Sequence, residues 1–93
     1  MNALQSKVQA LYLQRGYKAD LITLALGLCE EAGEVGKAVN VFHNPLYVLS
    51  EHSSSDSVAH ELCDVLVYAY SIANLLGIDL EEEMNSKLNG GLK

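Results

Sequence analysis

The chain has 93 residues, of which 49% are hydrophobic, and a formal net charge of −6 at pH 7. This length fits a single domain over residues 1–93 that is too small to cover all of its apolar surface, so we expect a homo-oligomer. The acidic balance argues against a nucleic-acid polymer as a partner. With no basic-then-apolar leader and no apolar run of about 18 residues, we expect a cytoplasmic protein without membrane contact.

Helical periodicity dominates the chain and no alternating strand pattern persists, which predicts an all-α, four-helix bundle-like domain. The first helix is expected over about residues 2–14. Asp20 is a good N-cap for a second helix, which should continue to about Phe42.

Proline and glycine set the later boundaries. Pro45 ends the second helix, because proline disfavours helical geometry in the residue before it. A loop follows, and Asp56 or Ser57 can cap a third helix that ends just before Gly77. Asp79 opens a short fourth helix with a capping-box pattern.

Two pairs of carboxylates stand out, each with its members three residues apart: Glu31 with Glu34, and Glu61 with Asp64. Residues at this spacing share one face of a helix. Their flanks are apolar, and the third helix contains no Lys or Arg that would neutralise Glu61 and Asp64. Neighbouring carboxylates repel each other unless a hard divalent cation lies between them, and oxygen-only ligands suit Mg²⁺ or Mn²⁺. The alternative is a solvated acidic face.

Residues near these carboxylates extend the candidate site. Tyr68 follows Asp64 by one turn on the same arc, and small residues such as Gly27 leave room for a ligand on the second helix. Lys37 can reach a phosphate or form a surface salt bridge. Glu30 lies about 100° away from its neighbour on the helix and is expected in solvent.

Other kinds of phosphate-binding or metal site fit this sequence less well. The Gly-x-x-Gly-Lys run of the second helix is not a phosphate loop, because Glu31 stands where the first glycine is needed. No histidine has a glutamate three positions before it, which argues against a di-iron bundle. A zinc site from Cys29, His60 and Cys63 stays open, although its spacing is not that of a structural site. Otherwise we expect both cysteines to be buried, reduced thiols.

The pattern Glu30-Glu31-x-x-Glu34 followed by Glu61-x-x-Asp64 resembles the EExxE…ExxD signature of the MazG-like nucleoside triphosphate pyrophosphohydrolases. The similarity covers about residues 21–76. It implies an all-α, Mg²⁺-dependent enzyme that cleaves NTPs or dNTPs between the α- and β-phosphates. The products are a nucleoside monophosphate and pyrophosphate, and the role is housecleaning of the nucleotide pool.

The resemblance also assigns roles to individual residues. Metal ligation and catalysis map onto Glu31, Glu34, Glu61 and Asp64. Substrate contacts are expected from Lys37, Tyr68 and Lys87, and candidates to surround the base are Tyr12, Tyr17 and Phe42. Members of this family are dimers or tetramers, so we expect a homodimer or homotetramer in which the third helix contributes to the interface. The alternative is a non-catalytic helical module that binds metal or nucleotide, or only dimerises.

Overall fold

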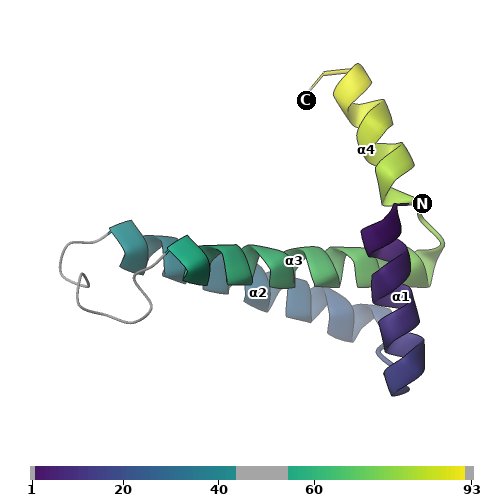
Figure 1. The fold of residues 1–93 in the computed structure, drawn as a ribbon, viewed down its shortest axis with the longest axis horizontal. Helices are drawn as coiled ribbons and strands as arrows, with labels where there is room; N and C mark the ends of the chain where they lie inside the picture. Colours follow the sequence, from purple (N-terminus) through teal and green to yellow (C-terminus); the bar gives the residue numbers. More distant parts are fainter. Residues whose placement is uncertain (1, 44–54, 92–93) are drawn as a thin grey trace.

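The computed structural model describes residues 2–43 and 55–91. Within these ranges the chain forms four α-helices and no strand (Figure 1): α1 (Ala3–Arg15), α2 (Leu21–His43), α3 (Ser55–Leu76) and α4 (Leu80–Asn89). The predicted all-α class is confirmed, and the ends of the predicted helices recur within about one residue, except at the start of the third helix. α3 begins at Ser55, so the prediction that Asp56 or Ser57 caps it is wrong, because both positions lie inside the helix. The loop expected after Pro45 lies outside the described residues.

Asp20 and Asp79 cap the N-termini of α2 and α4, as the sequence predicts. The Asp20 carboxylate accepts a hydrogen bond of 2.8 Å from the backbone N–H of Thr23, and this bond lowers the pKa of Asp20 below its ordinary value. Asp79 likewise accepts from the backbone N–H of Glu82 at 3.2 Å. At the end of α3, Gly77 adopts a left-handed φ of +70°, which allows the chain to turn sharply into α4.

The centre of the molecule is the antiparallel pair of α2 and α3, which run side by side (Figure 1). At Gly27 the ring of Tyr68 lies against the backbone of α2. A Cβ at position 27 would overlap Cε1 of this ring and would lie 2.6 Å from Cζ and 2.9 Å from Cδ1. The expectation that Gly27 leaves room for a ligand is therefore wrong, because Tyr68 already fills that space.

A buried glutamine joins α1 to the junction of α3 and α4. The Gln5 side chain has no exposed surface and donates to Oδ1 of Asn74 at 3.1 Å and to the carbonyl of Ile78 at 2.7 Å. Its Oε1 accepts from the backbone N–H of Leu80 at 3.1 Å. Because all polar atoms of this amide are paired, its burial is tolerated and the three elements are held in register.

The fourth helix leaves this junction as an arm. α4 departs from α3 with a bend of 106° and projects away from α2 (Figure 1). In the described part of the chain, no single helix is long and apolar enough to cross a membrane. α3 and α4 together have the length and composition of one membrane span, but the chain is sharply bent between them. The four helices thus form a packed trio of α1, α2 and α3 with α4 outside it.

Little apolar surface is enclosed within one chain. Among the hydrophobic residues that the structure describes, only Leu24 and Ala73 are buried. The accessible surface is 6979 Å², whereas a compact monomer of this mass exposes about 5,300 Å². The expectation of buried thiols is also wrong: Cys29 and Cys63 are both exposed, because they lie on outward faces of α2 and α3.

The contact between Gly27 and Tyr68 can be tested by adding one methyl group. Alanine usually stabilises a helix interior relative to glycine by about 0.5–1 kcal/mol, but at position 27 the methyl overlaps the tyrosine ring. We expect Gly27→Ala to lower the free energy of unfolding by about 1–3 kcal/mol in urea titrations. Gly36→Ala is the control, because nothing lies within 4 Å of a Cβ there, and it should be neutral or stabilising. Equal effects of the two changes would contradict this packing.

Candidate functional site

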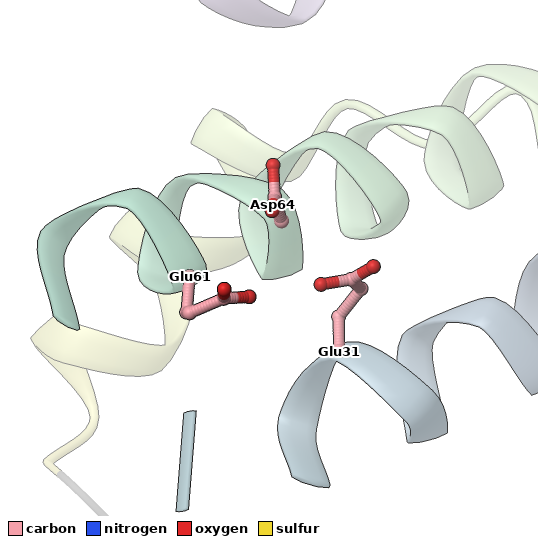
Figure 2. Close-up of side chains that lie close together, drawn as sticks. All are labelled: Glu31, Glu61 and Asp64. Carbon is pink, nitrogen blue, oxygen red and sulfur yellow. The ribbon is translucent and has the colours of Figure 1, made fainter. Parts of the chain in front are cut away.

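Three carboxylates converge between the two long helices. Glu31 projects from α2 toward α3, where Glu61 and Asp64 lie one turn apart (Figure 2). One oxygen from each of the three lies within 4.8 Å of the others, and all three side chains are half-buried. The spacing follows from the helix register: Glu31 lies one turn after Gly27, and Asp64 lies one turn before Tyr68.

The three-carboxylate cluster is electrostatically strained. Partial burial, followed by the charges of Asp64 and Glu61, raises the pKa of Glu31 above its ordinary value. His60 lies beside the cluster, with its Nε2 3.5 Å from Oδ2 of Asp64. This histidine is charged only when protonated, and its side chain is 75% exposed, so it offsets little of the repulsion.

The donor set fits a hard divalent cation. All donors are carboxylate oxygens, which Mg²⁺, Mn²⁺ and Ca²⁺ prefer. The three donor oxygens lie within 4.8 Å of one another, close enough that one ion could take a ligand from each carboxylate. A cation would also relieve the repulsion that raises the pKa of Glu31.

The zinc alternative is not supported. Among the described residues, Glu31, Glu61 and Asp64 are the only group of three His, Cys, Asp or Glu side chains close enough to share an ion. Cys29 and Cys63 are therefore not part of any such group.

The remaining predicted site residues are spread along the chain. Glu34 and Lys37 are exposed on α2 and lie outside the three-carboxylate cluster. Tyr68 is half-buried one turn from Asp64, as the sequence indicated. Lys87 is exposed on α4, which starts from the far end of α3, so it is not brought to the cluster of its own chain (Figure 1).

A pocket of about 510 Å³ lies between α1, the α1–α2 connection and the end of α3. Its walls include Leu24, Ser71, and the rings of Tyr12 and Tyr17, which meet edge to face with centroids 5.5 Å apart. The sequence pointed to both tyrosines without indicating that they share a wall. Phe42 instead lines a separate apolar hollow at the other end of the helix pair.

The comparison with protein families decides the assignment. Residues 20–89 match the MazG nucleotide pyrophosphohydrolase domain, and this range contains α2, α3, α4 and all three clustered carboxylates. The chain belongs to the MazG family. The resemblance seen in the acidic motifs is thereby confirmed, and the MazG match extends past them into α4. Neither the curated proteins nor the solved structures gave a match to this sequence.

Neutralising Glu31 should have opposite effects with and without metal. The folded-state pKa of Glu31 is raised, so in wild type without metal this group makes the protein less stable as pH rises through that pKa. We expect Glu31→Gln to raise the melting temperature in EDTA at pH 7 and to remove most of the increase that millimolar Mg²⁺ or Mn²⁺ gives wild type.

Glu82→Gln is the matched control for this experiment, because Glu82 is exposed on α4 and lies outside the cluster. It should leave both melting temperatures unchanged. A Glu31→Gln protein that is destabilised in EDTA and still gains stability with Mg²⁺ would contradict the strained-cluster interpretation.

Proposed function

We propose that this protein hydrolyses nucleoside or deoxynucleoside triphosphates between the α- and β-phosphates, releasing a nucleoside monophosphate and pyrophosphate. The observation that carries the proposal is the convergence of Glu31, Glu61 and Asp64 inside the region that matches the MazG family. A role in clearing non-standard or surplus dNTPs is consistent with this activity.

The carboxylates would act as a cation holder. Glu31, Glu61 and Asp64 would hold Mg²⁺, which when bound neutralises triphosphate charge and lowers the pKa of a coordinated water. Glu34 lies about one turn beyond Glu31 and outside the cluster. In this proposal it would either complete the ligand set or orient the attacking water. An experiment can distinguish these two roles. Only the role as a metal ligand predicts that Glu34→Gln loses the stabilisation that Mg²⁺ gives the wild-type protein.

The tyrosine-walled pocket would take the nucleoside. Leu24 and Ser71 in its wall each lie seven residues from a clustered carboxylate, a distance along the helices of about 10 Å. This span suits a nucleoside attached to a triphosphate whose phosphates lie at the cluster. Tyr68 lies between Asp64 and Ser71 on α3 and would contact the sugar or the α-phosphate, while Lys37 and Lys87 remain candidate phosphate contacts.

A non-catalytic module that binds metal or nucleotide is the second candidate. The position of Lys87, away from the cluster of its own chain, favours it. Hydrolysis assays separate the two candidates directly.

We expect purified protein with Mg²⁺ to release pyrophosphate from at least one member of a panel of NTPs and dNTPs. Glu61→Gln and Asp64→Asn keep the side-chain shape but remove charge, and each should lower the rate by at least about 10²-fold. Glu82→Gln should retain the wild-type rate. Wild-type protein that binds Mg²⁺ and nucleotide without releasing pyrophosphate would establish the non-catalytic module instead.

In a single chain the proposed substrate pocket is open to solvent. We therefore include an oligomeric assembly in the proposal. The surface exceeds that of a compact monomer of this mass by about 1,700 Å². Large apolar side chains are among the exposed ones: Ile22 and Leu26 are exposed one turn apart on α2, and Leu62 and Leu66 are exposed one turn apart on α3. We propose that the outer faces of α2 and α3 pair with a second copy, as a homodimer or a dimer of dimers.

Light scattering coupled to size exclusion tests this assembly. At micromolar concentration we expect a mass of two or four times 10.1 kDa. Leu62→Glu with Leu66→Glu should lower that mass, because charges on an interface cannot be buried unpaired. A wild-type monomer that hydrolyses nucleotides would refute the assembly and leave the metal site in place.

A further inference from the structure

The fourth helix is too short to be stable without packing. α4 has ten residues, and isolated helices of this length are marginal in water. Leu80, Met84 and Leu88 recur every four residues and form one apolar stripe, yet Met84 is 48% and Leu88 53% exposed. Within the described chain, α4 is fixed mainly at its first residues by the hydrogen bond from Leu80 to Gln5. Its apolar stripe therefore requires a partner surface.

The first helix offers a surface with matching properties. Gln5, Val8 and Tyr12 lie on the side of α1 that faces α3, as their burial shows. The neighbouring stripe, spanning an arc of about 80°, holds Leu4, Lys7, Leu11 and Arg15, all exposed. It combines two leucines with two cations.

α1 is positively charged, whereas the first turn of α4 is negatively charged. Residues 2–19 contain three cations and no Asp or Glu, whereas the first turn of α4 carries Glu81, Glu82 and Glu83. On the helical wheel, Glu81 and Glu83 flank the apolar stripe of α4 on its two sides. Among the described residues, no ion pair engages Lys7, Glu81 or Glu83 within the chain. Both the apolar stripe and its acidic flanks on α4 are therefore complementary to the stripe on α1.

The two helices of one chain cannot meet along their lengths. α1 and α4 both start near the Gln5 junction and run away from it in nearly opposite directions (Figure 1). A two-fold rotation reverses both directions, so the α4 of each copy can run alongside the α1 of the other. In this arrangement the two N-terminal turns lie level, with Leu88 near Leu11 and the acidic turn near Lys7.

We propose that α4 docks on α1 of a second copy of this chain, through Leu80, Met84 and Leu88 against Leu4 and Leu11, with Glu81 facing Lys7. The contact forms twice in a symmetric pair. It is separate from the outer faces of α2 and α3, and two distinct two-fold contacts are what a dimer of dimers requires.

Cysteine cross-linking between differently tagged chains tests the docking. In a Cys29→Ser, Cys63→Ser background that retains its helical circular dichroism, chains with Leu11→Cys are mixed with chains carrying Leu88→Cys and oxidised with copper phenanthroline. Each chain then holds a single thiol, so a mixed-tag band reports only contacts between copies. We expect this band to be at least several-fold stronger than for Leu13→Cys with Leu88→Cys, because Leu13 is exposed on the opposite side of α1.

Charge reversal provides the second measurement. Lys7→Glu in the Leu11→Cys chain should lower the cross-linked yield, and Glu81→Lys in the Leu88→Cys chain should restore it. Equal yields for the Leu11 and Leu13 chains, or yields indifferent to these charges, would overturn the docking. Neither readout uses metal or nucleotide, so failure here leaves the proposed hydrolysis standing, and inactive protein leaves the docking standing.

Discussion

The close approach of Tyr68 to Gly27 sets the geometry on which the rest of this structure depends. Without a Cβ at position 27, the ring can lie against the α2 backbone and fix the spacing and register of the two long helices. One turn along each helix from this contact, Glu31 faces Asp64. The register that packs the two helices therefore also brings their carboxylates together. A change in the helix packing would alter the positions of the carboxylates.

The carboxylates occupy positions that folding alone would give to apolar residues. Glu31 lies on the inward stripe of α2 with Leu24, Leu28 and Val35, all partly or fully buried. A hydrophobic residue there would pack without repulsion, whereas Glu31 is held with a raised pKa beside two other acids. Residues that lower the stability of the folded chain are typical of functional sites, where a bound ligand compensates for the unfavourable interactions. This is consistent with the proposal that the cluster holds a cation.

Local signals were enough to predict the helices and the carboxylates. Caps such as Asp20 and Asp79, and the left-handed Gly77, act within a few residues, and helical spacing alone places Glu61 and Asp64 on one face. The family resemblance carried by the acidic motifs was also readable from the sequence and is confirmed by the match.

What could not be predicted depends on contacts between distant segments. The Gln5 amide pairs with groups of α3 and α4 that lie about seventy residues away in the chain, and no periodicity signals such a partner. The burial expected for Cys29 and Cys63 was wrong for a related reason. Average burial tendencies assume an enclosed core, and a single copy of this chain encloses little.

The position of Tyr68 constrains how a nucleotide could use the proposed site. Its ring lies against the α2 backbone at Gly27, and along α3 Tyr68 stands between Asp64 of the cluster and Ser71 in the wall of the tyrosine-walled pocket. A nucleoside triphosphate that joined the two, as we propose, would have to pass beside the half-buried Tyr68. The proposed nucleotide route and the packing of α2 against α3 would thus depend on the same side chain.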